Sequence, residues 1–185
     1  QIAKIPTKVP DGKIKIQYLT DDTFNSTDVD VSPNGLWVAF MSDRSGHADF
    51  KRMDVYVTSI SGGEDRNVTP NTYEYYDYRP RWSPDSRKLV FTSDRTGWRN
   101  IGVIDVRTSQ TRMLTRSKFD EYNPRWSPDG QWIAYVANCD WNFQLMKIRA
   151  NGSGNSIQIT NGDGVHGGID AYQARGTIRW TPDNR

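Results

Sequence analysis

Cysteine is nearly absent from this chain of 185 residues: Cys139 is the only one, so no disulfide can form within the chain. Histidine occurs twice, at His47 and His166, and two histidines on separate loops make neither a metal site nor a catalytic triad by themselves. Apolar runs long enough to span a membrane are missing. An excess of one charge is missing as well, because 24 basic residues stand against 22 acidic ones. We therefore expect no metal, no cofactor, no nucleic-acid partner and no membrane span.

What the chain does contain is a repeat. A serine or threonine followed by proline recurs at Ser32, Ser83, Ser127 and Thr181, with steps of 51, 44 and 54 residues. A period of about 40–50 residues made of short strands is typical of a β-propeller, in which each repeat forms one four-stranded blade. No segment keeps the apolar spacing of a helix, so we expect an all-β chain of antiparallel blades. A second marker, an apolar residue followed by threonine, keeps the same period at Thr20, Thr69, Thr115 and Thr160.

The serine–proline motif is typical of a tight turn between the first two strands of a blade. Serine suits the first turn position, proline presets φ at the second, and glycine suits the fourth. We therefore interpret the motif as structural and not as catalytic. Its residues are Ser32, Pro33, Ser83, Pro84, Asp85, Ser127, Pro128, Asp129, Gly130, Pro182 and Asp183.

The repeat also predicts how the chain divides, with the strands of a blade named a, b, c and d in chain order. About three and a half blades are present, half of a six- to eight-bladed ring. The first strand d has no strand c beside it unless a later part of the ring supplies one, so the remaining blades, from this chain or a second copy, are expected partners. The predicted divisions are 1–13 as an N-terminal extension, 14–20 as the closing strand d, 21–69, 70–115 and 116–160 as three blades, and 161–185 as the start of a fourth.

Three tryptophans hold the same position at the end of strand a. Trp82, Trp126 and Trp180 each precede the turn motif directly. We expect them to be equivalent core residues that are buried between blades.

The residues of the repeat resemble those of known families. The segment 124–130, Pro-Arg-Trp-Ser-Pro-Asp-Gly, resembles the repeat of TolB-like (WD-like) propellers, as do Ser-Asp-Arg at 93–95 and the threonine that ends each blade. The segment 93–105 is also similar to the propeller of prolyl oligopeptidase- and dipeptidyl peptidase-family serine peptidases. That resemblance implies catalytic residues in a separate hydrolase domain, and no Gly-x-Ser-x-Gly motif occurs here. The TolB-like resemblance favours a periplasmic or extracellular location, and a peptidase-related chain leaves a cytoplasmic location open.

Strand parity places the b–c and d–a loops on one face of the propeller and the tight turns on the other. The b–c and d–a loops, which form the loop face, are rich in aromatic residues and carboxylates, which suits a protein or sugar surface. The alternative is that single tyrosines pack between blades. The candidate partner-binding residues are Tyr73, Tyr75, Tyr76, Asp77, Tyr78, Trp98, Arg99, Phe119, Tyr122, Trp141 and Tyr172.

Asp43-Arg44 and Asp94-Arg95 occupy the same point of two successive blades. They are either ligand-binding groups or a repeated structural device, a hairpin cap or an inter-blade ion pair, and the repetition favours the structural role. Asn138, Asp140 and Asn142 have the alternate spacing of a calcium loop but lack its glycine and its distal glutamate.

Three functions fit these features. The leading hypothesis is a non-catalytic scaffold that binds a protein partner through the aromatic and acidic loop face. The alternative is the N-terminal part of the substrate-gating propeller of a prolyl oligopeptidase-family serine peptidase, whose hydrolase domain is not in this chain. A carbohydrate-binding or carbohydrate-active propeller is the third. We expect no hydrolase activity from the chain alone, and the peptidase alternative leaves activity open for the full-length gene product.

Overall fold

The computed structural model describes residues 1–4, 17–20, 24–44, 52–70, 75–139, 142–160 and 178–183. These residues form fourteen strands and no helix, so the all-β prediction is confirmed. Blade one consists of β3 (Ser26–Val31), β4 (Trp37–Ser42), β5 (Asp54–Ser59) and β6 (Arg66–Asn67). Blade two consists of β7 (Asp77–Trp82), β8 (Lys88–Ser93), β9 (Asn100–Asp105) and β10 (Gln110–Met113). Blade three consists of β11 (Asp120–Trp126), β12 (Trp132–Cys139), β13 (Asn142–Arg149) and β14 (Ile157–Gln158).

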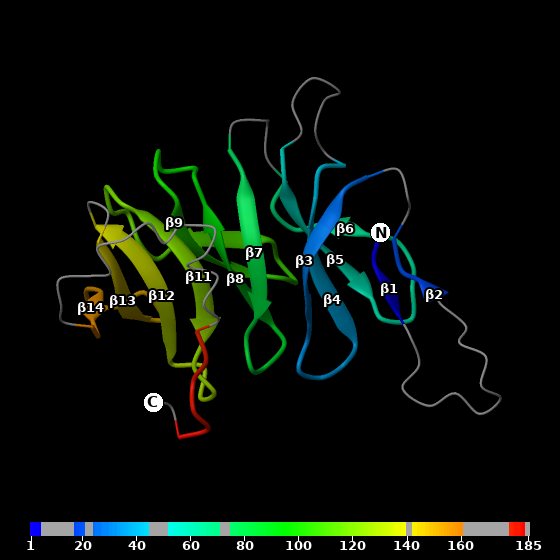
Figure 1. Cartoon of the computed structure of the whole chain (residues 1–185). Coiled ribbons are helices and arrows are strands. Elements are labelled where there is room, and N and C mark those ends of the chain that lie inside the picture. The colour runs from blue at the N-terminus through cyan, green and yellow to red at the C-terminus, as the bar shows by residue number, and fades with distance from the viewer. Residues whose placement is uncertain are drawn as a thin grey trace.

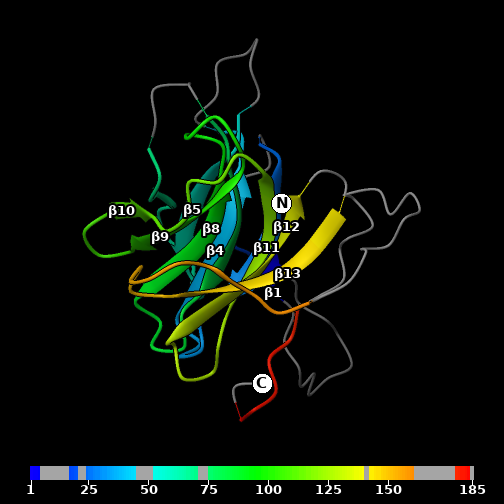
Figure 2. The same ribbon diagram turned by 90° about the vertical axis from the view of Figure 1, so that its left-hand side faces the viewer.

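The three sheets follow one another along an arc. In each sheet the strands pair antiparallel in chain order, from strand a to strand d. The three a strands, β3, β7 and β11, lie side by side in the middle of the arc (Figure 1). A view turned by 90° shows the sheets stacked one behind another (Figure 2). This is the packing of propeller blades, and the described part of the chain is an open arc of such a ring.

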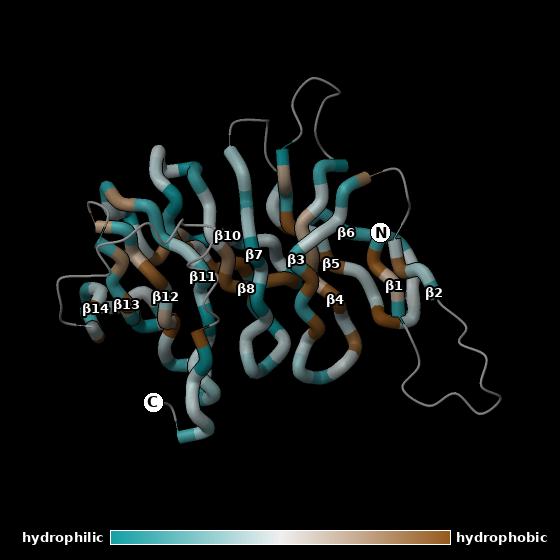
Figure 3. Tube along the Cα trace, viewed as in Figure 1, coloured by the Kyte–Doolittle hydropathy of each residue, from teal (hydrophilic) through white to brown (hydrophobic). Residues whose placement is uncertain are grey.

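The hydrophobic core lies between neighbouring sheets. One cluster joins blades one and two and includes Val57, Trp82 and Phe91, all buried. A second joins blades two and three and includes Val90 and Tyr135. Brown hydrophobic segments run along the strands, and the turns and loops are mostly hydrophilic (Figure 3). Blades one and two therefore bury both faces of their sheets, which explains why their central strands carry apolar runs and no strict alternation. Among the described residues, blade three packs one face, against blade two.

The serine–proline motif forms the expected tight turn in each of the three blades. The amide of Gly130 donates to Ser127 O at 2.9 Å, and Ser83 and Ser32 accept the same bond in the other two blades. The serine side chain has a second role that composition alone did not indicate. Buried Ser127 Oγ accepts the amide of Trp132 at 2.9 Å and donates to Asp129 Oδ1, so it ties the start of strand b to the turn.

A bulge recurs in every a strand. Asp28, Arg79 and Asn123 have φ values of 50°, 52° and 54°, and the pairing register of strands a and b shifts beside each of them. Positive φ is uncommon outside glycine, and a bulge turns the strand locally. No local sequence pattern predicts this bulge, because none of the three positions is glycine.

The repeated tryptophans link neighbouring a strands. The indole Nε1 of Trp82 donates to Asp30 O at 3.2 Å, that of Trp126 to Arg81 O at 3.1 Å, and that of Trp180 to Arg125 O at 3.2 Å. The three positions are therefore equivalent, as predicted. Their burial differs: Trp82 is buried, whereas Trp126 and Trp180 are half-buried.

The N-terminal residues change one expectation. The strand at 14–20 is not left alone, because β2 (Gln17–Tyr18) pairs antiparallel with β1 (Ala3–Lys4). Buried Ile2 packs with Phe40 in a cluster that joins this hairpin to blade one. Residues that the sequence placed in an extension thus form a strand of a sheet.

The bonds of this hairpin identify its strands. The amide of Ile2 donates to Thr20 Oγ1 at 2.9 Å, and the amide of Leu19 donates to Ile2 O at 2.8 Å. In each blade a residue at the start of strand c makes both of these bonds with strand d. Hence β1 is a strand c and β2 is a strand d. In a complete blade, strand b would pair with the other edge of β1. The equivalent residues are Val55 with Thr69, Ile101 with Thr115 and Leu145 with Thr160.

No helix within the described ranges is long and apolar enough to cross a membrane.

Candidate functional site

The loop face carries a connected set of arginine and tyrosine side chains. The rings of Tyr76 and Tyr78 stack with centroids 5.7 Å apart and planes 7° apart. The guanidinium of Arg99 lies 5.6 Å from the ring centroid of Tyr78 and 5.7 Å from that of Tyr122. Arg52, in blade one, lies 5.5 Å from that of Tyr76. The set therefore spans all three blades, and we call it the aromatic–arginine belt: Arg52, Tyr76, Tyr78, Arg99 and Tyr122.

Hydrogen bonds hold the belt in place at blade three. The hydroxyl of Tyr122 donates to Asp120 Oδ2 at 3.0 Å, and the amide of Arg99 donates to Asp120 Oδ1 at 3.0 Å. Burial, followed by the charge of Asp94, raises the pKa of Tyr78 to about 12. The belt therefore presents neutral phenols and charged guanidinium groups, a combination that suits contact with a protein surface.

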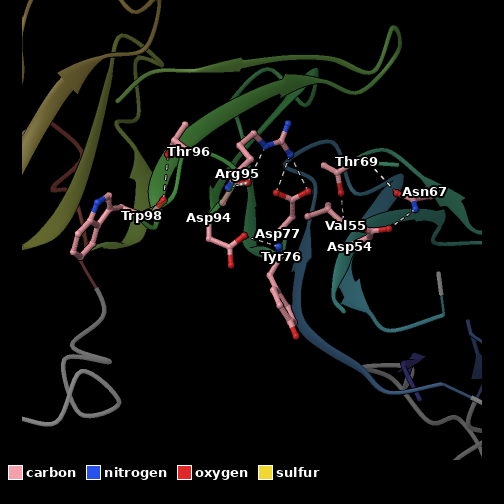
Figure 4. Close-up of polar contacts among 11 residues, drawn as sticks. Asp54, Val55, Asn67, Thr69, Tyr76, Asp77, Asp94, Arg95, Thr96 and Trp98 are labelled. Atoms are coloured by element: carbon pink, nitrogen blue, oxygen red, sulfur yellow. Dashed lines mark hydrogen bonds and ion pairs between the residues drawn. The ribbon is translucent and has the colours of Figure 1, made fainter. Parts of the chain in front are cut away.

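The other predicted site residues are not members of the belt, and several lie outside the described residues. Trp98 is 48% exposed, and its indole points away from the neighbouring polar cluster (Figure 4). Phe119 is half-buried, and the ring of Tyr75 lies 4.5 Å from the guanidinium carbon of Arg95. The positions outside the described residues are Tyr73, Trp141 and Tyr172, as are His47, Asp140 and His166.

Asp77 is not a binding residue, because it has no exposed surface. Its two carboxylate oxygens each accept a bond of 2.9 Å from Arg95 Nη2 (Figure 4). The prediction placed Asp77 among the loop tyrosines, but it is the first residue of β7 and points between blades. Alternation along the strand puts Asp77 and Tyr78 on opposite faces.

The repeated aspartate–arginine pairs also have structural roles. Asp43 Oδ1 and Asp94 Oδ1 accept amides at the start of strand a, from Asn25 at 2.9 Å and Tyr76 at 2.7 Å. Arg44 pairs with Asp65, and Arg95 pairs with Asp77. These are caps and ion pairs within a blade, and not the inter-blade pairs that were one of the alternatives.

Two buried carboxylates form inter-blade links that the sequence analysis did not identify. Thr69 and Thr115 each end a blade, and each accepts an amide from strand c of its own blade. Their hydroxyls bond to carboxylates in strand a of the next blade, Asp77 and Glu121 respectively. The repeated threonine, read from the sequence only as a marker, therefore joins successive blades.

Glu121 predicts a pH dependence of stability. The side chain is 2% exposed, and burial raises its pKa from 4.5 to about 7. The folded state then keeps a proton that the unfolded state loses, so this stability is fully present below about pH 4.5 and is lost as the pH rises through about 7. The loss should amount to about 3 kcal/mol in the free energy of unfolding. We expect urea titrations at acidic and mildly basic pH to show it in the wild type and not in Glu121→Gln. Equal pH slopes for the two proteins would contradict the assignment.

Metal ligands do not gather in the described part of the chain: no group of three or more His, Cys, Asp or Glu residues there could hold a metal ion.

The geometry defines the protein class as part of a β-propeller, in which three four-stranded blades follow one another along an arc with their a strands side by side. Residues 10–166 match the family model described as PD40, TolB beta propeller domain, and the chain belongs to this family. The structure of a putative TolB from Agrobacterium tumefaciens is similar, with a TM-score of 0.63 and 26% identity over 75% of this chain and 47% of that one.

Curated relatives include peptidases. The chain is 40% identical over 67 residues to the uncharacterized peptidase YuxL of Bacillus subtilis, covering 36% of this chain and 9% of that protein. It is 30% identical over 91 residues to dipeptidyl-peptidase 5 of Porphyromonas gingivalis, covering 48% of this chain and 13% of that protein. The chain thus spans only a small part of these relatives.

Proposed function

We propose that this propeller is a non-catalytic scaffold that binds a protein partner through the aromatic–arginine belt. The observation that carries this function is the continuity of the belt across three blades, with half-buried tyrosines and arginines held by one another. Tyrosine, tryptophan and arginine dominate the binding energy of protein interfaces because they offer large rigid surfaces with polar ends. Exposed Trp98 extends the same surface.

A site-specific photo-crosslinker tests this function. We expect a crosslinking residue at Trp98 to capture one defined protein in extracts of the source organism. The matched control places it at Leu36, which is 57% exposed and lies on the face of the tight turns. The same capture from both positions would argue against a loop-face interface.

Truncation of the belt then measures its contribution. Arg99→Ala should weaken binding of the captured protein by about tenfold or more, because the guanidinium contacts the rings of both Tyr78 and Tyr122. The substitution keeps the hydrogen bond from the backbone amide of residue 99 to Asp120. Arg116, which is exposed and outside the belt, provides the control Arg116→Ala. Unchanged affinity for Arg99→Ala would remove the belt from the interface.

A second candidate function is favoured by the peptidase relatives: the N-terminal part of a propeller that gates access to a serine hydrolase domain. The identity of 40% over 67 residues to one peptidase supports it. The full coding sequence of the gene distinguishes the two candidate functions. A Gly-x-Ser-x-Gly motif in an α/β-hydrolase region after residue 185 would favour gating, and its absence from the full coding sequence would favour the scaffold.

A further inference from the structure

An arginine occupies the same position in three successive repeats. Arg81, Arg125 and Arg179 directly precede the repeated tryptophans, and blade one has Asp30 at this position. The tryptophan bonds described above fix these residues on neighbouring a strands, near the tight turns and away from the aromatic–arginine belt. A turn or a core position does not need arginine there, so its repetition requires another reason.

The arginines line one open hollow. Its volume is ≈ 570 Å³, and its wall includes Asp30, Arg81, Arg125 and Arg179 together with the three tryptophans. Arg81 and Arg125 are half-buried and Arg179 is exposed. The hollow is therefore open to solvent while its charged wall is partly shielded from it.

The guanidinium groups have few partners. Arg81 Nη1 donates to Pro80 O at 2.6 Å and Arg125 Nη1 donates to Pro124 O at 3.1 Å. Within the described ranges, these are the only acceptors in hydrogen-bond contact with the two groups. A guanidinium has five donors in a planar fork, so most of this capacity is left for a ligand.

The charges of the hollow are not balanced. Asp30 attracts both arginines, but its carboxylate already accepts the amide of Trp82 at 2.7 Å. Burial, and after it the repulsion from Arg81, lowers the pKa of Arg125 to about 10. Two like charges held together in this way gain from an anion placed between them.

We infer that this hollow binds an acidic peptide segment, whose carboxylates are received by Arg81 and Arg125. Arginine recognises carboxylate through two parallel hydrogen bonds, which fits the free edges of these guanidinium groups. The site lies at the opposite end of the a strands from the belt, so it is independent of the function proposed there.

The chemistry of the wall favours a peptide over an acidic sugar. Sugar sites use exposed aromatic faces and several donors and acceptors for hydroxyl groups. Here Trp82 is buried, and the indole nitrogens of all three tryptophans are engaged with neighbouring strands. The polar groups left for a ligand are guanidinium donors. They match carboxylates, which only accept hydrogen bonds, better than sugar hydroxyl groups, which both donate and accept.

Binding can be followed by intrinsic tryptophan fluorescence, because three tryptophans line the hollow. The purified protein is titrated with a short blocked peptide of aspartate and glutamate, with its asparagine and glutamine counterpart, and with an oligogalacturonate. We expect the acidic peptide alone to bind, more weakly as salt is added. Arg81→Gln/Arg125→Gln should weaken binding by at least about tenfold. The matched control, Arg107→Gln/Arg116→Gln, removes the same charge from exposed positions and should bind as the wild type does.

Folding is checked on the same samples. The double variant should keep the urea midpoint of the wild type, since it removes a repulsion between two cations. If it does not fold, Arg125→Lys replaces it: lysine keeps the charge but loses the planar fork, and binding should fall several-fold. Equal binding of the neutral peptide, a preference for oligogalacturonate, or no loss of affinity in either arginine variant would overturn the inference.

Discussion

Replacement of Trp82 by alanine is expected to destabilise the protein by about 3–5 kcal/mol, as large-to-small changes in a packed core do. The ring is 6% exposed and lies in the cluster between blades one and two. The substitution also removes the bond from Nε1 to Asp30 O, which leaves that carbonyl without its indole partner. Urea denaturation, followed by far-ultraviolet circular dichroism, measures the change.

Two further variants distinguish the loss of the hydrogen bond from the loss of the buried ring. Trp82→Phe keeps an aromatic ring and loses the Nε1 donor, so it should cost about 1–2 kcal/mol. Trp126→Ala should cost less than Trp82→Ala, because Trp126 is half-buried. A loss below about 1 kcal/mol for Trp82→Ala would place the ring outside the core.

Replacement of Asp77 by alanine is expected to lower the free energy of unfolding by about 3–5 kcal/mol, because it leaves the cation of Arg95 unpaired in the interior. The carboxylate is fully buried, and the side chain of Arg95 is 18% exposed. Thr69 loses its acceptor in the next blade at the same time. The same denaturation experiment measures the loss.

A double variant distinguishes the ion pair from simple cavity formation. Asp77→Ala/Arg95→Met removes both charges, so its loss of stability should be smaller than the sum of the two single losses. Asp120→Ala serves as the more accessible counterpart: the pair of Arg99 and Asp120 has side-chain exposures of 43% and 30%, and this ion pair should contribute at most about 1 kcal/mol. Similar losses for Asp77→Ala and Asp120→Ala would show that burial does not strengthen the Asp77 pair.

The belt illustrates what the sequence could indicate about a site. Runs such as the tyrosines at 75, 76 and 78 show that aromatics gather in one loop, and strand parity assigns the loop to a face. Which of them meet across blades depends on distances between strands far apart in the chain. Arg99 contacts Tyr78 from another part of the same blade and Tyr122 from the next blade. Asp77 was misassigned for the same reason, because composition does not say which face of a strand a side chain occupies.

The sequence by itself determined the architecture, since the period of the turn motif and the length of the strands between turns are local properties of the chain. Proline is present in every turn motif and glycine in two of them, both through their own backbone preferences, and the threonine that closes each blade recurs in step with the motif. Only the tertiary structure decided the contacts between blades. The tryptophan bonds to the preceding a strand, the bonds from threonine to carboxylate, the pairing of β1 with β2 and the cluster of arginines in one hollow all join residues that are distant in sequence. Their partners are set by how the sheets stack, and no local pattern carries that information.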